Sequence, residues 1–170
     1  MSCPVICPRE EVSRDEVSPG PIGADESILR ALFPSDRSAQ GIKRSVIPIS
    51  HLWDGRLSVW RLSPRVGLSL NELVAVLEPR LVRGNGEKFD ELRATLASTL
   101  RKFQANDTRA VCLLDECTID NEGNKHPAHA NIAICDVLRK TIAKGDDTVI
   151  AIQEGLKLLF EPMTVWQRPN

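Results

Sequence analysis

The sequence predicts a single α+β domain, in which an antiparallel sheet of hairpins carries about three helices on one face. Two observations indicate the sheet: two apolar runs flank a polar loop over 109–135, and two extended segments flank an Asp-Gly turn over 44–62. Helices are indicated because apolar residues recur at helical spacing over 70–77 and 87–103. With 170 residues, the chain is long enough to bury a core without added cross-links.

Composition narrows the possible classes of function. The formal net charge is −1, so no basic surplus indicates binding to nucleic acid. No apolar run is long enough to span a bilayer, and the N-terminus lacks the basic start and apolar core of a secretory signal. We therefore expect a cytoplasmic protein without membrane contact, in which the five cysteines are reduced thiols.

The two ends of the chain are expected to lie outside the domain. Residues 1–24 are rich in proline, serine and acidic residues, which predicts an extended arm. Cys3 and Cys7 lie in this arm and are interpreted as ordinary thiols, because a proline-interrupted segment is a poor scaffold for metal ligands. The single domain then spans 25–162, and 163–170 form a C-terminal tail.

The first part of the domain contains one ambiguous segment and one hairpin. Residues 25–33 fit either a short helix capped by Asp25 or a first strand, and Pro34 ends the segment in both cases. The hairpin has a first strand that contains Pro48, which indicates an edge position or a bulge. In order, it comprises a strand at 44–50, a turn at 51–55 and an alternating strand at 56–62.

Helices are expected in the middle and at the end of the domain. Ser69 and Glu72 form a capping box at the start of the first helix. The strongest helical pattern covers 87–103, where one stripe is apolar and the charged side chains lie off it. A short helix over 136–143 and a last helix over 148–160 follow.

The hairpin over 109–135 contains the candidate chemistry. Its first strand is the apolar run at 110–114, and its second strand is the alternating segment at 130–135. Between them, residues 120–124 are turn formers. This arrangement places His126 and His129 at the mouth of the second strand.

His126 and His129 are the candidate catalytic residues, as a general acid and base, with Asp115 or Glu116 orienting one ring. Arg30 joins them, because Arg30 on a first strand and a serine on a second, in the run at 50–54, resemble the nucleotide pocket of mono-ADP-ribosyltransferase-like folds. No late glutamate lies in a matching motif. No nucleophile motif accompanies these residues. They predict a small hydrolase or transferase that acts on a nucleotide or phosphate-containing ligand, in a pocket where the three side chains converge.

Zinc binding is the second chemistry that this hairpin suggests. Cys112, Cys117, His126 and His129 are candidate ligands, because zinc prefers thiolate and imidazole donors. Their spacing, Cys-x4-Cys-x8-His-x2-His, departs from the tight cysteine pairs of structural zinc sites. The alternative is a core Cys112, a loop Cys117 and histidines that only make structural hydrogen bonds.

Three short signatures resemble those of a family of small uncharacterised bacterial proteins: an early Leu-x-Arg…Pro, a middle Leu-Ser-Val and a late His-Ala-x-Ile. The resemblance spans about 27–134 and implies a bacterial origin. It brings no established activity, so no catalytic residue is carried over from it. In this sequence the signatures are Leu29-Arg30-Ala31 to Pro34, Leu57-Ser58-Val59 and His129-Ala130-Asn131-Ile132.

The predicted function is that of a non-enzymatic accessory or interaction protein, for example a subunit of a bacterial defence or toxin-related complex. The sequence has no complete catalytic motif and is close to neutral, and its N-terminal arm is suited to docking on a protein partner. The alternatives are the hydrolase or transferase and the zinc-binding domain described above.

Overall fold

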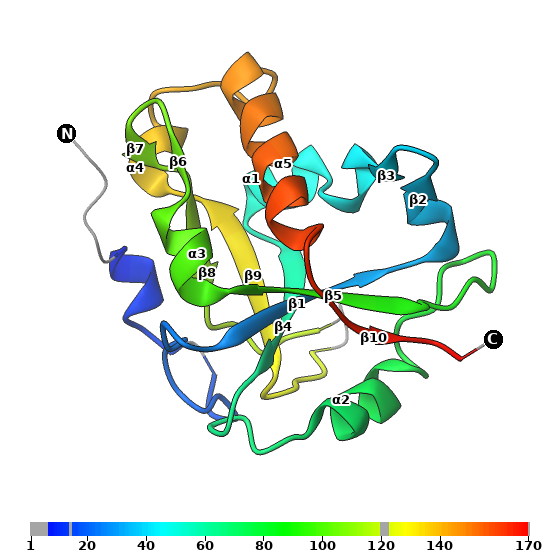
Figure 1. Ribbon diagram of the computed structural model, residues 1–170. Coiled ribbons are helices and arrows are strands. Elements are labelled where there is room, and N and C mark those ends of the chain that lie inside the picture. Colours follow the sequence, from blue (N-terminus) through cyan, green and yellow to red (C-terminus); the bar gives the residue numbers. More distant parts are fainter. Residues whose placement is uncertain (1–6, 14, 120–122, 170) are drawn as a thin grey trace.

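The fold is an antiparallel sheet of six strands with helices on both faces (Figure 1). The computed structural model describes residues 7–13, 15–119 and 123–169. The order of the strands across the sheet is β10-β5-β1-β4-β9-β8. Their bounds are β1 Ser27–Leu32, β4 Leu57–Leu62, β5 Glu91–Leu96, β8 Val111–Leu114, β9 His129–Ile134 and β10 Thr164–Gln167.

Short elements complete the fold. The α-helices are α1 Ile49–Asp54, α2 Leu70–Leu77, α3 Ala97–Lys102, α4 Asp136–Arg139 and α5 Asp147–Phe160. Three 3-10 turns are η1 Pro8–Glu10, η2 Pro34–Asp36 and η3 Arg44–Val46, and two small hairpins pair β2 Arg37–Ser38 with β3 Gly41–Ile42 and β6 Gln104–Ala105 with β7 Thr108–Arg109. The predicted α+β class is confirmed.

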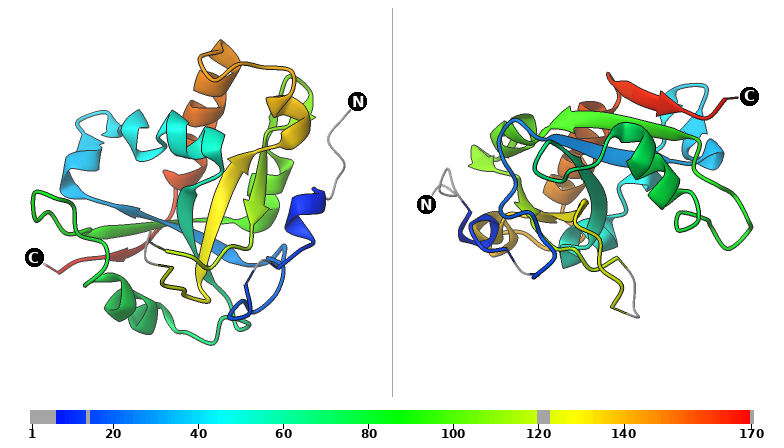
Figure 2. Two further views of the ribbon diagram at one scale, coloured as in Figure 1. Left: turned by 180° about the vertical axis from the view of Figure 1, so that it is seen from behind. Right: turned by 90° about the horizontal axis from the view of Figure 1, so that it is seen from below.

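The sheet separates two apolar cores. Helices α1, α3 and α5 pack on one face, where Leu57, Val59 and Ile132 contribute from the sheet. Helix α2 packs on the other face, against Leu29 and Trp60. The expected three helices on one face are therefore confirmed as α1, α3 and α5, and Figures 1 and 2 show α2 as an additional helix on the opposite side of the strands. None of the helices in the described part of the chain is long and apolar enough to cross a membrane.

The hairpin over 109–135 is confirmed. Strands β8 and β9 pair antiparallel, with Val111 opposite Ile134. The predicted turn at 120–124 between them lies in part outside the described residues, which exclude 120–122. The alternating residues of β9 point Ala130, Ile132 and Ile134 into the core beneath α5. His129 is the first residue of β9, one position before the predicted start of that strand.

The predicted hairpin over 44–62 is half wrong. Strand β4 forms where expected, but 44–50 contain η3 and the start of α1 in place of a strand. Pro48 lies at the N-cap of α1, where its fixed φ and missing N–H do not interrupt hydrogen bonding. Gly55 adopts φ of 70° and caps the end of α1, so the Asp-Gly pair ends a helix and does not form a hairpin turn.

The predicted helix over 87–103 is also wrong over most of its length. Residues Glu91–Leu96 form β5, and only Ala97–Lys102 are helical. All six residues of β5 pair with β1, which places the segment inside the sheet between β1 and β10. Helix propensity amounts to only a few tenths of a kcal/mol per residue, so these strand pairings outweigh it.

Two helices have side-chain caps at their first turns, and the ambiguous first segment is a strand. Ser69 and Glu72 form the predicted capping box of α2, with Ser69 N donating to Glu72 Oε2 over 2.7 Å. Asp146 caps α5 by accepting from Thr148 N over 2.8 Å. Residues 25–33 resolve to a strand, since Ser27–Leu32 form β1 at the centre of the sheet.

Both chain ends are more integrated than expected. The predicted C-terminal tail supplies β10, which pairs with β5 at one edge of the sheet. In the predicted N-terminal arm, Cys7, Glu10 and Ile22 are buried. Glu10 accepts a hydrogen bond from Leu113 N over 2.6 Å, so this segment covers the edge strand β8.

A buried ion-pair network closes one end of the sheet. Arg61 on β4 is fully buried and donates two hydrogen bonds of 2.8 Å to Glu26 and one of 2.9 Å to Asp115. A further bond of 2.9 Å goes from Arg61 Nη1 to Gly20 O. Burial alone raises the pKa of a carboxyl group, but the bonds from Arg61 and from Gly23 N lower the pKa of Glu26 below its usual value.

Replacement of Arg61 by methionine tests this network. Arg61→Met leaves the carboxylates of Glu26 and Asp115 buried without their partner, and we expect the free energy of unfolding to fall by about 3–5 kcal/mol. Urea denaturation followed by circular dichroism measures the change. The matched control is Arg56→Met, because Arg56 is exposed and, among the described residues, its ion pair is with Asp54; a loss in Arg61→Met no larger than in this control contradicts the assignment.

Candidate functional site

His129 is held in one tautomer beside a serine of the neighbouring strand. Its Nδ1 lies 2.7 Å from the carbonyl oxygen of Glu116, so Nδ1 carries the proton and donates. Its Nε2 lies 3.2 Å from Ser58 Oγ on β4, and this unprotonated nitrogen can accept the hydroxyl proton. A serine, a histidine and a group that orients the histidine are therefore aligned in hydrogen-bond contact.

Packing fixes the His129 ring. The ring is buried and makes an edge contact with Trp60, with centroids 5.1 Å apart. On the same strand, Asn131 donates to the carboxylate of Glu116 over 3.1 Å. Burial lowers the pKa of His129 below its usual value, so the ring is neutral at neutral pH.

His126 lies on the same face of the sheet as His129. Its ring is 5.8 Å from Trp60, centroid to centroid, so the two histidines contact the same tryptophan. The Nδ1 atom accepts from Ala128 N over 3.1 Å, and burial lowers the pKa of His126 too. His126 therefore shapes the turn that leads into β9.

Arg30 does not join the histidines. On β1 it alternates with Leu29 and Ala31, which belong to the core beneath α2, so its side chain lies on the opposite face from Trp60 and His129. The guanidinium donates to Val46 O over 2.7 Å, on the side of α5. The expected convergence of three side chains on a phosphate is therefore wrong for Arg30.

The four predicted zinc ligands also separate. The three cysteines that come together in the described part of the chain are Cys7, Cys112 and Cys135, whose sulfur atoms all lie within 4.8 Å of one another. We call these residues the thiol group. Cys117 is a buried residue of the loop after β8 and is not among them, and neither histidine contributes a donor atom to the group.

Strand pairing explains how the thiol group forms. Cys112 on β8 lies opposite Ala133 on β9, and Cys135 follows two residues after Ala133, so both cysteines project from one face of the hairpin. Cys7 approaches from the segment that covers β8. The sequence did not indicate this group, because the approach of Cys112 and Cys135 depends on the strand register and that of Cys7 on the path of the N-terminal segment.

The electrostatics of the thiol group favour a thiolate at Cys7. The thiol of Cys112 donates a hydrogen bond to Cys7. This bond, a second bond from the Arg9 backbone N–H, and the nearby positive charge of Arg109 together lower the pKa of Cys7 to about 7 in spite of burial. The same hydrogen bond between the two side chains, together with burial, raises the pKa of Cys112. Cys135 is disulfide-bonded, so the expectation that all five cysteines are reduced thiols is wrong for this residue.

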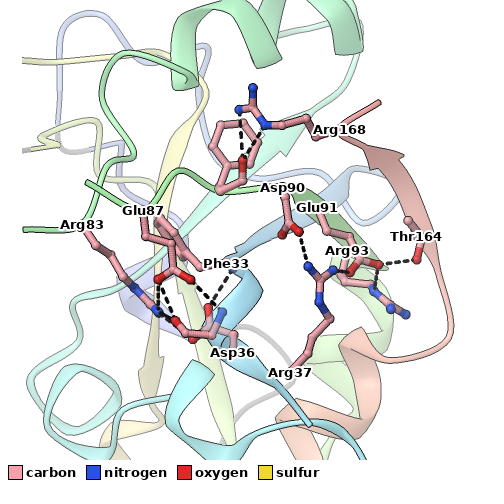
Figure 3. Close-up of polar contacts among 12 residues, drawn as sticks. Phe33, Asp36, Arg37, Arg83, Glu87, Asp90, Glu91, Arg93, Thr164 and Arg168 are labelled. Carbon is pink, nitrogen blue, oxygen red and sulfur yellow. Dashed lines mark hydrogen bonds and ion pairs between the residues drawn. The ribbon is translucent and has the colours of Figure 1, made fainter. Parts of the chain in front are cut away.

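A cluster of ion pairs joins β5 and β10 to the turn after β1 (Figure 3). Arg37 bridges the carboxylates of Asp90 and Glu91, and Glu91 also accepts from Thr164 Oγ1 over 2.6 Å. A cavity of about 270 Å³, lined in part by Arg37 and Arg93, lies beside this cluster. Both arginines already contact carboxylate or carbonyl oxygens, so we interpret the cluster as a set of structural contacts that hold these segments together.

The pH dependence of stability tests the neutral state of His129. Because burial lowers its pKa in the folded protein, the unfolded chain binds a proton first, and stability falls as the pH drops below about 6.5. We expect His129→Gln to reduce this slope, by at most about 1.4 kcal/mol per pH unit. Urea titrations between neutral and mildly acidic pH measure it. The control is the exposed His51→Gln, and an equal slope in both variants rejects the assignment.

No family model matches this chain, and it has no match among curated proteins or solved structures. The resemblance to small bacterial proteins therefore remains a prediction. The roles of Ser58, His129 and the thiol group rest on their geometry in this structure.

Proposed function

We propose that this protein is a zinc-binding domain, in which the thiol group holds the ion when it is reduced. The observation that carries the proposal is the approach of three buried sulfur atoms, from Cys7, Cys112 and Cys135, to within 4.8 Å of one another. Zinc is bound by thiolates at about 2.3 Å in tetrahedral geometry, which requires sulfur atoms about 3.8 Å apart. Small side-chain movements are enough to reach that spacing.

The surroundings of the thiol group suit a soft divalent cation. Thiolates select zinc over magnesium or calcium, which prefer oxygen donors. Three thiolates and one Zn²⁺ leave a net charge of −1, and Arg109 lies close enough to lower the pKa of Cys7. The described residues supply three of the four donors that a tetrahedral ion requires.

Binding of zinc would anchor the N-terminal segment. Cys7 comes from this segment, whereas Cys112 and Cys135 lie in and directly after the strands of the edge hairpin. One ion would therefore cross-link parts of the chain more than 100 residues apart. In the structure Cys135 is disulfide-bonded, so a metal that uses all three sulfur atoms requires prior reduction by a dithiol.

Metal analysis of the purified full-length protein tests the proposal. After reduction with a dithiol, incubation with Zn²⁺ and gel filtration, we expect one zinc ion per chain, and a large loss of zinc in Cys7→Ser, Cys112→Ser and Cys135→Ser. Cys117→Ser is the matched control, because Cys117 is equally buried but lies outside the group. Absence of zinc from the reduced protein, or equal loss in the control, overturns the proposal.

Removal of zinc provides an independent readout. A ligand at 100 times its Kd stabilises the folded state by about 2.7 kcal/mol, so a chelator should lower Tm of the reduced protein by roughly 5–11 °C. Differential scanning calorimetry measures this shift. The shift should vanish in Cys7→Ser and persist in Cys117→Ser, and an unchanged Tm in the reduced wild-type protein speaks against a structural ion.

The accessory role remains a proposal with less support from the structure. Its premise was a loose N-terminal arm available for docking on a protein partner. Cys7, Glu10 and Ile22 of this arm are buried against the domain, and that surface is therefore already covered. The hydrolase alternative has more support from the structure, because Ser58, which the sequence analysis did not propose as catalytic, lies within hydrogen-bond distance of His129.

A further inference from the structure

We propose that Ser58, His129 and Asn131 form a nucleophilic site for uncharged carboxylic esters, with Ser58 as the nucleophile. The three residues come from the adjacent strands β4 and β9 and share the face on which Trp60 lies. Ser58 is directly opposite Asn131 in the register, and Trp60 is directly opposite His129. This site lies on strands rather than loops, and it does not depend on the thiol group.

The hydrogen bonds of His129 give it the state that a general base requires. Glu116 O accepts from Nδ1, so the lone pair of Nε2 faces Ser58 Oγ at 3.2 Å. Burial favours the neutral ring, which can take a proton at neutral pH. A serine hydroxyl is a weak nucleophile by itself and needs such a base within hydrogen-bond reach.

Ser58 is accessible although it lies in a central strand. Both of its neighbours, Leu57 and Val59, are buried in the opposite core, whereas Ser58 retains part of its exposed surface. Asn131 and Ala31, two residues of modest size, belong to strands on either side of β4. Ser58 is thus half-buried and keeps part of its surface exposed on the face that carries His129.

Asn131 supplies a hydrogen-bond donor next to the nucleophile. Residues directly opposite each other in antiparallel strands have Cβ atoms about 4.5–5.5 Å apart, so the Asn131 amide lies beside Ser58. One N–H of this amide donates to Glu116 Oε2, and the amide has a second N–H. A side-chain amide of this kind can stabilise the oxyanion of an acyl-transfer intermediate.

The charges near the site favour an ester over a phosphate. The carboxylates of Glu116 and Asp15 both interact with the His129 ring, and they repel an anionic ligand. Arg30, the residue predicted to bind a phosphate, lies on the opposite face of the sheet. A neutral acyl group meets no such repulsion.

The reaction conserves atoms and charge. Ser58 Oγ attacks the ester carbonyl carbon while its proton passes to His129 Nε2, and the carbon–oxygen bond to the alcohol then breaks. The alcohol leaves with the proton from His129, and an acyl group remains on Ser58. Water then attacks the acyl group with His129 again as the base, which releases the carboxylic acid and restores the serine.

Acylation by p-nitrophenyl acetate tests the site in the full-length protein. We expect release of p-nitrophenolate, and intact mass spectrometry with peptide mapping should locate an acetyl group on Ser58. Ser58→Ala should lower the rate by about 10²-fold or more, and His129→Gln should lower it similarly. The rate should rise with pH to a plateau, with a midpoint below the usual pKa of histidine.

The control variant is Ser38→Ala, because Ser38 is exposed and lies on the separate β2–β3 hairpin, outside the sheet that carries the site. Circular dichroism and thermal melts establish that each variant is folded, and Ser58→Cys, which retains a nucleophile, should still be acylated. An acetyl group found only on other residues, an unchanged rate in Ser58→Ala, or no acylation of the wild-type protein overturns the proposal.

Discussion

The fully buried Arg61 is the constraint on which the rest of the structure depends. A buried guanidinium must be surrounded by acceptors, and here they come from Glu26, Asp115 and Gly20 O. Gly20 and Glu26 lie in the segment before β1, and Asp115 follows β8, so one side chain on β4 fixes two distant parts of the chain. Glu116 directly follows Asp115, so the network also positions the carbonyl that orients His129.

A second buried charge performs the same task at the edge of the sheet. Glu10 accepts from Leu113 N and pairs with Arg101 and Arg109, which seals an edge strand that would otherwise expose unpaired N–H groups. This contact carries Cys7 to the thiol group. The N-terminal segment is thus part of the fold, although its composition is typical of a loose tail.

The errors of the sequence interpretation share one physical origin. The segment 87–103 has a helical apolar stripe, yet β5 is buried between two strands, where Leu92 and Ala94 pack beneath α2. Pro48 and Gly55 carry turn signals that fit a hairpin and a capped helix equally well. In each case the local pattern allowed two structures, and contacts with distant segments selected one of them.

The sequence by itself determined the α+β class, the hairpin over 109–135, and the capped helices α2 and α5. These features depend on local periodicity and on hydrogen bonds between residues a few positions apart. Only the tertiary structure decided that Ser58 faces His129, that Arg30 lies on the other side of the sheet, and that Cys7 meets two other cysteines. Such contacts arise from strand order and chain closure, which no local pattern encodes.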